Sequence, residues 1–464
     1  MLEDFIIRHI KAQLPFEPNE EKEALFKVLG HYLVSTDPVK AFILRGYAGT
    51  GKTSVVSALV RAMQQLQQQC VLLAPTGRAA KVLSKYSGFP AFTIHKYIYR
   101  QNRLGVEAFS LADNKHTHTL FIVDEGSMIS ASRDNATFGS GNLLDDLIRF
   151  IYQGQGCHLL LLGDNAQLPP VGSEESRALD KDYIAGFGLH VEDFTLTQVA
   201  RQALDSGILS EATRLRQALS ETEHSGSGGP FSVTPDGKDI IRLQGTEVVD
   251  QMERSYQEAG AEETLIITRS NKAANLYNQG VRARILWKED QVSSGDRLMI
   301  SKNNYYWTQE YEQLDFLANG DLVEIVRLRN EHEMYGYRFA EASLRLVDYD
   351  WEIDALIWID TLFTDSPEAN YEMHKKLYAL IAEDYPEIRN SKERTKKIFE
   401  SPYYNALQVR FAYAVTCHKA QGGQWRHIYL DPGTGTNPDI SATAQLRWLY
   451  TALTRATEKL YLLR

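Results

Sequence analysis

The sequence feature that most constrains the fold is GYAGTGKT at residues 46–53. It follows the apolar run AFILRG and opens GKTSVVSALVRAMQQL, a segment with helical character. A glycine-rich loop between a strand and a helix turns backbone N–H groups inward around phosphate oxygens, and the helix N-terminus adds positive potential. The loop therefore predicts an ATP-binding α/β domain, in which Lys52 reaches the β- and γ-phosphates and Thr53 holds Mg²⁺. The residues that this loop would place around the nucleotide are Gly46, Ala48, Gly49, Thr50, Gly51, Lys52, Thr53 and Ser54.

The length of the chain and its apolar runs predict more than one domain. The 464 residues are about three times the ~150 residues of a typical domain. Short apolar runs alternate with segments of helical character, which predicts a parallel α/β sheet. The first series of runs is at 41–46, 70–75, 120–125 and 158–164. A second series, which predicts a second core, is at 264–270, 410–416, 427–432 and 459–464.

Three segments interrupt these series. Residues 220–237, SETEHSGSGGPFSVTPDG, are polar and rich in Gly and Ser, as in a flexible connection. From about 296 to 405 the sequence changes to short β-type runs and then a charged, Tyr-rich helical stretch, which predicts an insertion that splits the second core. Residues 99–119 are polar and lie between two expected strands, where a small hairpin or a loop would fit.

Composition restricts the partners and the compartment. Lys and Arg number 50 against 60 Asp and Glu, a net charge of −10, so nucleic acid cannot be held by a global positive field and any track must be local. No apolar run approaches the ~18–20 residues of a membrane span, and the charged start MLEDFIIRHIKAQLPF is unlike a signal peptide. We therefore expect a cytoplasmic protein without a membrane partner. Cys70, Cys157 and Cys417 are far apart and odd in number, which predicts buried thiols.

Two further strand ends carry the polar groups that a phosphate-binding loop needs. In LFIVDEGSM, Asp124 suits Mg²⁺ coordination and Glu125 suits a general base, because adjacent residues at a strand end diverge. In LLLLGDNAQLPPVG, Asp164 and Gln167 follow a buried strand at the edge where α/β sheets bind ligands, and the Gln167 amide can donate to a γ-phosphate. Each pattern alone is often structural, and the phosphate-binding loop favours the functional interpretation.

In their order along the chain, the motifs resemble those of superfamily 1 helicases of the RecD-like and Dda-like group, the branch that typically translocates 5′ to 3′ on single strands. The resemblance covers about 16–300 and 405–464. The motifs that carry it are GYAGTGKT (46–53), APTGRAAKVL (74–83), TIHKYI (93–98), IVDEGSM (122–128), LLGDNAQLPPVG (161–172), LTQVARQ (196–202), VTCHKAQGGQW (415–425) and YTALTRA (450–456).

The resemblance implies an α/β fold of two RecA-like P-loop NTPase domains with parallel sheets and ATP between them, the second split by a small, mostly β, SH3-like insertion. The first domain would span 1–219, with a strand-separating pin or loop element at 99–119. A linker at 220–237 would lead to the second domain, formed by 238–295 and 406–464. The insertion at 296–405 would be an accessory β-barrel-like domain with a helical segment, although ordinary surface elaboration also fits.

The resemblance also assigns roles at the nucleotide. Arg201 and Arg455 match arginines that such helicases extend to the γ-phosphate, where a guanidinium stabilises the charge that develops in phosphoryl transfer. Either arginine alone would more often be a surface or ion-pair residue. Thr53 and Asp124 would bind Mg²⁺, and Gly423 would lie at the nucleotide. The expected catalytic residues are Lys52, Glu125, Gln167, Arg201 and Arg455.

Small hydroxyls, backbone amides and a few cations in the same motifs suit phosphate contacts that carry no sequence information, and histidines could stack on bases. By itself, either histidine would more often be a packed or capping residue. The nucleic-acid-binding residues that the resemblance implies are Thr76, Gly77, Arg78, Thr93, His95 and Lys96 in the first core and Thr416, His418, Lys419 and Gln421 in the second.

Three positions depart from the family pattern. Lys22 stands where relatives carry a glutamine that reads adenine, and a lysine donates but cannot accept. Adenine would then be read by neighbouring backbone, or the selectivity would be relaxed. Gly126 replaces a small or branched apolar residue, which predicts a looser turn without loss of chemistry. Gln424 replaces a frequent glutamate, which would alter a relay to the ribose or the γ-phosphate.

The function that these observations favour is an ATP-dependent DNA helicase that translocates on single-stranded DNA and separates strands. Its partners would be single-stranded and tailed duplex DNA and other DNA repair or replication proteins, in the cytoplasm at the nucleoid. Two alternatives stay open: an RNA-directed helicase, since phosphate contacts tolerate either sugar, and a non-translocating P-loop ATPase subunit of a larger DNA-processing complex.

Overall fold

The computed structural model describes residues 2–101, 109–132, 138–199, 205–225, 231–311, 316–349, 351–433 and 440–463. The chain forms two compact units of residues in mutual contact. The first unit comprises Met1–Ile241, Gln421–Gln424 and Thr434–Leu460, and the second comprises Arg242–Ala420, Trp425–Gly433 and Tyr461–Arg464. The two units are defined by contacts between residues, whereas the expected domains are defined by sequence motifs. The expected domain boundaries therefore stay a prediction.

The first unit contains a six-stranded parallel sheet in the order β3-β2-β6-β7-β1-β8. Its strands are β1 (Lys40–Gly46), β2 (Gln69–Ala74), β3 (Ala91–Thr93), β6 (Thr119–Val123), β7 (His158–Gly163) and β8 (His190–Leu196). In the register, Ile43 of β1 pairs with Leu161 of β7, and Ile122 of β6 pairs with Leu160. The four central strands read as continuous apolar runs because helices cover both faces of such a sheet.

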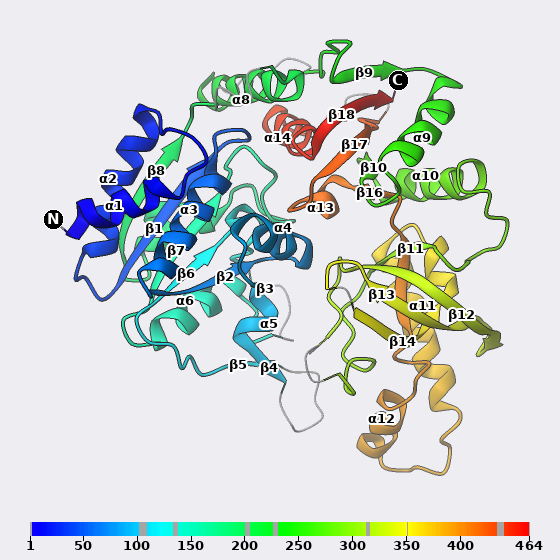
Figure 1. Ribbon diagram of the computed structural model, residues 1–464. Helices are drawn as coiled ribbons and strands as arrows, with labels where there is room; N and C mark the ends of the chain where they lie inside the picture. The colour runs from blue at the N-terminus through cyan, green and yellow to red at the C-terminus, as the bar shows by residue number, and fades with distance from the viewer. Residues whose placement is uncertain are drawn as a thin grey trace. The chain divides into compact units, whose positions relative to one another are not determined.

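Helices α1 (Leu2–Ala12), α2 (Glu20–Val34) and α3 (Lys52–Gln65) pack against this sheet (Figure 1, blue). Their buried side chains form one apolar cluster with β1, β6 and β7, and it includes Phe26, Leu59, Phe42 and Ile122. The other elements of the unit before residue 200 are α4 (Gly77–Ser87), α5 (Ile94–Ile98), β4 (Tyr99–Gln101), β5 (Phe109–Leu111), α6 (Leu143–Gln153) and α7 (Lys181–Ala185). This cluster fixes the end of β1, where the phosphate-binding loop begins.

Strands β4 and β5 form an antiparallel pair within the segment for which a hairpin or loop was expected. Tyr99 pairs with Leu111, and Gln101 pairs with Phe109. Residues 102–108, between the two strands, lie outside the described residues. A role of this hairpin in strand separation stays a prediction.

A second sheet has the order β16-β10-β17-β18-β9, and β10 is parallel to both of its neighbours. The strands are β9 (Ile240–Leu243), β10 (Thr264–Thr268), β16 (Ala414–Thr416), β17 (Trp425–Leu430) and β18 (Ala456–Leu463). The helices that precede, connect or follow these strands are α8 (Gly207–Ser225), α9 (Glu247–Glu258), α10 (Asn271–Arg284), α13 (Cys417–Ala420) and α14 (Ala442–Leu453). The predicted pair of RecA-like cores with parallel sheets is confirmed.

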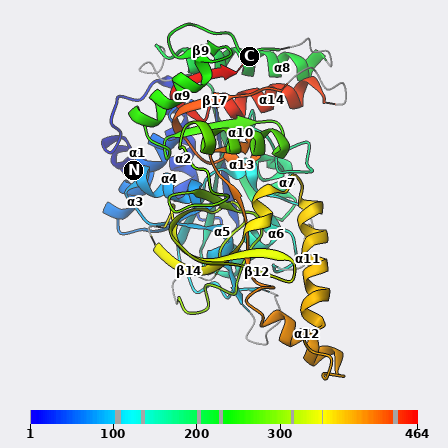
Figure 2. The ribbon, with the colours of Figure 1, turned by 90° about the vertical axis from the view of Figure 1, so that its right-hand side faces the viewer.

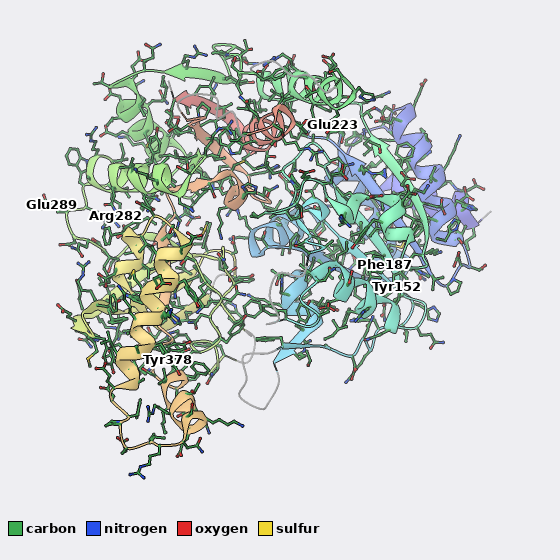
Figure 3. The ribbon with its side chains drawn as sticks, turned by 180° about the vertical axis from the view of Figure 1, so that it is seen from behind. Tyr152, Phe187, Glu223, Arg282, Glu289 and Tyr378 are labelled. Atoms are coloured by element: carbon green, nitrogen blue, oxygen red, sulfur yellow. The ribbon has the colours of Figure 1, made fainter. Side chains whose placement is uncertain are left out.

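The expected β insertion is a closed barrel of β11 (Arg297–Ile300), β12 (Leu322–Met334), β13 (Tyr337–Leu346), β14 (Trp351–Trp358) and β15 (Leu407–Phe411). Helices α11 (Pro367–Ala382) and α12 (Ser391–Phe399) lie between β14 and β15 in the chain and extend beside the barrel (Figure 2). The Tyr378 hydroxyl of α11, labelled in Figure 3, lies 3.3 Å from that of Thr395 in α12. Trp358 and Leu377 anchor the helices to the barrel through one buried aromatic cluster.

Within the described part of the chain, every helix is too short or too polar to cross a membrane. Cys157 and Cys417 are buried free thiols, as expected, whereas Cys70 is only half-buried. Cys70 is the second residue of β2, and the first half of this strand is less buried than the second half.

Candidate nucleotide-binding site

The loop between β1 and α3 has the conformation that its glycines permit. Gly49 and Gly51 have positive φ angles of 75° and 86°, which side chains with a Cβ rarely adopt. Gly51 is also the N-cap residue of α3, so no side-chain oxygen caps this helix. The first N–H groups of α3 therefore remain available for an anion.

Hydrogen bonds within the loop hold its shape. The Thr50 hydroxyl is buried and donates to the Tyr47 carbonyl at 2.8 Å. The Lys52 ammonium folds back and donates to the Gly46 carbonyl at 2.6 Å. A Cβ at Gly46 would lie 3.0 Å from the Thr50 hydroxyl, so a glycine is required there. The loop is thus preformed, with its lysine directed over it.

A cavity of about 620 Å³ in the first unit opens beside this loop. The walls contain most of the residues that the sequence assigns to nucleotide and metal binding. Those that line it are Ala48, Gly49, Gly51, Lys52, Thr53, Ser54, Asp124, Glu125, Gln167 and Arg455. Gly46, Thr50, Lys22 and Gly423 were also assigned to the nucleotide but do not line the cavity. Arg201 lies outside the described residues.

The acidic pair follows β6 directly. The Glu125 backbone N–H donates to Asp124 Oδ1 at 2.8 Å. Desolvation, followed by the charge of Glu125, raises the pKa of Asp124 to about 6. Glu125 has φ of 53° and ψ of 39°, a left-handed conformation that is uncommon for a residue with a side chain. Asp124 and Glu125 both line the one cavity.

Gly126, the residue after Glu125, packs closely against β7. A Cβ at Gly126 would lie 2.9 Å from the Leu162 carbonyl of β7 and 3.1 Å from the Leu179 side chain. The expected looser turn is therefore wrong, because the glycine is required by close backbone packing and begins a 3₁₀ turn, Gly126–Met128.

Asp164 and Gln167 lie in the loop that follows β7. Asp164 is 2% exposed and accepts from the Ala166 backbone N–H at 2.9 Å through Oδ1. Burial raises the pKa of Asp164, and the charge of Lys52 opposes that shift. Gln167 Oε1 is buried and has no hydrogen-bond partner among the described residues. A residue that lines the cavity and has an amide oxygen without a partner is suited to a bound molecule or its water.

Arg455 is a buried cation, with 4% of its surface exposed. Its guanidinium donates to the Thr451 carbonyl at 3.1 Å, to the Gly423 carbonyl at 3.3 Å and to the Thr454 hydroxyl at 3.2 Å. All three acceptors are uncharged, and among the described residues Arg455 forms no ion pair. A desolvated guanidinium that lines a cavity and has no carboxylate partner of its own is matched to an anionic ligand.

Several residues of the site have no sequence assignment. Gln13 and Pro15 line the cavity because α1 packs on α3, a contact that no motif announces. Tyr47 also lines it, and the Arg216 guanidinium lies 4.4 Å from the centroid of its ring. Tyr47 could have been identified from its place inside the phosphate-binding loop.

Lys22 is buried below the loop, with 2% of its surface exposed. A Cβ at Gly51 would lie 3.2 Å from Lys22 Cε, and the ammonium lies 5.6 Å from the centroid of the Phe16 ring. Burial lowers the pKa of Lys22. Lys22, which aligns with the family glutamine, thus packs against Gly51. Its role toward the nucleotide stays a prediction.

The residues assigned to nucleic acid in the first core also have structural contacts. Thr76 and Thr93 cap α4 and α5, where they accept from the backbone N–H groups of Ala79 and Lys96. His95 packs against the rings of Tyr99 and Phe138, with centroids 5.9 and 5.0 Å away, and burial lowers the pKa of its imidazole to about 4.

Gly77 is the buried first residue of α4, and the next residue, Arg78, donates to the Gln424 carbonyl at 3.3 Å. The half-buried Lys96 lies in α5. Contacts of these residues with nucleic acid stay predictions.

The second set follows β16. Thr416 ends that strand and is half-buried, and His418 and Lys419 are exposed on α13. Gln421 differs: it is 6% exposed and donates to the Leu168 carbonyl at 2.7 Å. Its assigned contact with nucleic acid is not tested by this bond and stays a prediction.

Comparisons with known proteins give two family models and several helicase relatives. Residues 29–227 match the family model of an AAA domain, and residues 411–463 match that of a UvrD-like helicase C-terminal domain. The ATP-dependent RecD2 DNA helicase of Deinococcus radiodurans is 23% identical over 95% of this chain and 48% of its own length. The ATP-dependent DNA helicase dda of Enterobacteria phage T4 is 25% identical over 89% of this chain and 92% of its own length.

Some relatives are much longer than this chain. An uncharacterized protein of Methanocaldococcus jannaschii is 22% identical over 96% of this chain, which spans 38% of that protein. Among solved structures, Pif1 helicase from Bacteroides in complex with ADP-AlF3 and ssDNA aligns with 96% of this chain and 92% of its own, at 14% identity and a TM-score of 0.46.

Proposed function

Because the chain belongs to the superfamily 1 helicases, in their RecD-like and Dda-like group, we propose that it is an ATP-dependent DNA helicase. ATP hydrolysis at the cavity beside α3 would drive movement along single-stranded DNA and separate a duplex ahead. The observation that carries this proposal is the meeting of Lys52, Glu125 and Arg455 in the walls of one cavity. Those residues come from three motifs that lie far apart in the sequence.

The phosphate-binding groups are complementary to a triphosphate. The uncapped N-terminus of α3 offers backbone N–H groups, and Lys52 and Arg455 add two positive charges. Arg455 has only uncharged acceptors in this structure, so a γ-phosphate would give it an ionic partner. Stabilising charge at the γ-phosphate is the main protein contribution to phosphoryl transfer.

Thr53 and Asp124 are suited to Mg²⁺. Both offer hard oxygen ligands and both line the cavity. One Asp124 oxygen accepts from the Glu125 N–H, and no described residue donates to the other. When bound there, Mg²⁺ would neutralise negative charge on phosphate oxygens.

Glu125 and Gln167 would act on the attacking water. Both carboxylates line the cavity, so Glu125 would act as a general base while Asp124 holds the metal. Gln167, with its unpartnered buried oxygen, would hold the water in line.

Nucleic acid would be held by phosphate contacts from the two motif groups around Thr76 and His418. The chain has a net charge of −10, so binding must depend on local cations and hydroxyls and should weaken steeply with salt. We propose single-stranded and tailed duplex DNA as the partners and 5′ to 3′ as the direction of movement.

Strand displacement tests activity and direction together. Duplexes with either a 5′ or a 3′ single-stranded tail are incubated with the protein, with and without ATP. We expect ATP-dependent displacement of the 5′-tailed duplex only. Displacement of only the 3′-tailed duplex would contradict the direction. Absence of displacement on both, with DNA-stimulated ATPase activity, would contradict the helicase and favour a non-translocating ATPase.

The choice of nucleic acid is tested by ATPase stimulation. Single-stranded DNA and RNA of equal length are compared at equal nucleotide concentration. The proposal predicts stronger stimulation by DNA. Stronger stimulation by RNA would show an RNA-directed motor instead.

A further inference from the structure

Tyr450 connects two loops of the ATP site from behind the cavity. It lies in α14 with 1% of its surface exposed and does not line the cavity itself. Its hydroxyl accepts from the Ala48 backbone N–H of the phosphate-binding loop at 2.8 Å. The same hydroxyl donates to Asp164 Oδ2 at 2.7 Å. One phenol thus bridges the loops that follow β1 and β7, and all these residues belong to the first unit.

The donor and the acceptor are fixed in both hydrogen bonds of the Tyr450 hydroxyl. An amide N–H can only donate, so the phenol oxygen accepts from Ala48 and must give its one proton to Asp164. Asp164 Oδ1 already accepts from the Ala166 N–H, so both of its oxygens act as acceptors. Burial and the nearby Asp164 charge raise the pKa of Tyr450 far above its ordinary value, which keeps the phenol protonated.

Two neighbours fix the far end of the same loop. The Thr451 hydroxyl accepts from the Leu168 N–H at 2.8 Å. The Gln421 amide donates to the Leu168 carbonyl at 2.7 Å. The loop is therefore held at Asp164 and at Leu168. Gln167 lies between these points, lines the cavity and has a buried Oε1 without a hydrogen-bond partner among the described residues.

We propose that Tyr450 is a positioning residue for ATP hydrolysis, whose hydroxyl holds the Asp164–Leu168 loop at a set distance from the phosphate-binding loop and so places Gln167 for the reaction. This inference rests on the proposed function. Tyr450 touches neither the cavity nor a reacting atom, so its effect passes through Ala48 and Asp164. A misplacement of a catalytic group by about 1 Å can cost ~10²-fold in rate.

The alternative is that Tyr450 only fills the core. Tyr32 in α2 provides a matched control, because it is also 1% exposed and its hydroxyl donates to a buried backbone oxygen, that of Leu159, at 2.8 Å. Tyr32 belongs to the same unit but does not line the cavity. Replacing either tyrosine with phenylalanine removes one buried hydroxyl and retains the ring.

The experiment compares Tyr450→Phe and Tyr32→Phe in the full chain, by ATP hydrolysis with and without single-stranded DNA, affinity for a fluorescent ATP analogue and thermal melting. We expect Tyr450→Phe to lower kcat about tenfold or more, equivalent to ~1.4 kcal/mol of transition-state stabilisation, with KM and analogue affinity changed less than about threefold. Tyr32→Phe should lower the melting temperature by a similar amount and keep kcat.

A second pair tests the proposal if Tyr450→Phe does not fold. Thr451→Val removes the hydroxyl that accepts from Leu168, and Thr451→Ser retains it. We expect Thr451→Val to lower kcat and Thr451→Ser to restore most of it, since serine keeps a hydroxyl that can accept from the Leu168 N–H.

The outcomes distinguish a failure of the positioning role of Tyr450 from a failure of the proposed function. If the unmodified protein hydrolyses ATP and Tyr450→Phe and Thr451→Val both keep kcat within about twofold, the positioning role is wrong and the proposed function stands. If both tyrosine variants lower kcat equally, the effect is one of stability, and the positioning role is again wrong. If the unmodified protein does not hydrolyse ATP, the proposed function fails first.

Discussion

Two strand-to-helix turns, one in each parallel sheet, differ in what caps the helix. After β1, the N-cap of α3 is Gly51, which has no side chain and a positive φ of 86°. After β10, the N-cap of α10 is Ser270, whose extended backbone directs its hydroxyl to accept from the Ala273 N–H at 3.1 Å. The first helix leaves its N–H groups for a ligand, whereas the second satisfies them internally. The comparison predicts phosphate binding at the turn whose helix has no side-chain cap, and none at the turn that Ser270 caps.

The lysines at the two turns differ in the same way. Lys52 begins α3 and folds back over its loop to the Gly46 carbonyl. Lys272, the second residue of α10, is exposed. The comparison implies that a positive charge matters where an uncapped helix and a glycine loop surround it.

The largest effect expected from this comparison is on Lys52. Lys52→Ala should abolish ATP hydrolysis, a loss of ~10³-fold or more, because the charge on the transferred phosphate loses its main cation. Phosphate release at saturating ATP measures it. Lys272→Ala is the matched control and should stay within about twofold of the unmodified protein. Comparable activity of the two variants would remove the distinction between the turns.

Arg455 tests whether the first turn needs a cation from outside its own loop. Arg455→Lys keeps the charge but cannot reproduce the three bonds of the guanidinium. We expect hydrolysis to fall by ~10³-fold, by analogy with other arginine fingers, with a modest loss of ATP affinity. Single-turnover hydrolysis and equilibrium binding separate these quantities. A tenfold or smaller effect would mean that Arg455 does not reach the γ-phosphate.

Exchanging the caps tests the comparison directly. Gly51→Ser would introduce a side chain at a positive φ and 3.2 Å from Lys22 Cε, and we expect nucleotide affinity to fall about tenfold or more. Ser270→Ala removes the cap of α10 and should cost ~1 kcal/mol of stability. Nucleotide titration and urea unfolding measure the two effects. Tight nucleotide binding by Gly51→Ser would show that the uncapped helix is not the basis of the site.

The smallest effect concerns two other turns, β3 to α5 and β16 to α13, which carry His95 and His418. Burial holds the pKa of His95 at about 4, below its ordinary 6.5. Between these values the unfolded chain binds a proton that the folded chain does not, so the free energy of unfolding falls as pH drops from 6.5 toward 4 and is unaffected above 6.5. The contribution is ~1–3 kcal/mol at pH 4.

Urea unfolding at pH 7.5, 6 and 5 measures this slope. His95→Phe should flatten it, because a phenyl ring can pack against Tyr99 and Phe138 in place of the imidazole and does not titrate. His418→Asn should change it less, since His418 is exposed. An unchanged slope in His95→Phe would place His95 in water, available to a base as the motif suggests.

Sequence patterns predicted the fold class, and most of the residues that they assign to the nucleotide line one cavity. The apolar runs predicted β1, β2, β6, β7, β10, β16, β17 and β18 but not β3, β8 or β9, and four of the five barrel strands lie within the expected insertion at 296–405, whereas β15 begins at Leu407. GYAGTGKT and the strand-end residues Asp124 and Gln167 all lead to one cavity. These features are local, since glycine conformations, helix starts and strand ends depend on a few consecutive residues.

Side-chain surroundings could not be predicted in this way. Gln13 reaches the cavity only because α1 packs on α3. The sequence pattern suggested a loose turn at Gly126. It could not show that a Cβ at this position would lie 2.9 Å from the Leu162 carbonyl oxygen. Burial and close packing arise from segments distant in the sequence, and a motif does not record them.

The sequence by itself determined that the chain has two α/β cores and a phosphate-binding loop, because apolar periodicity and glycine spacing act over a few residues. Only the tertiary structure decided what surrounds that loop: the buried Lys22 beneath it, the uncharged acceptors of Arg455 and the phenol of Tyr450. Ala48 and Tyr450 are 402 residues apart in the chain, and their hydrogen bond exists because packing of apolar surface brings α14 to the loop and excludes the water that would otherwise compete for it.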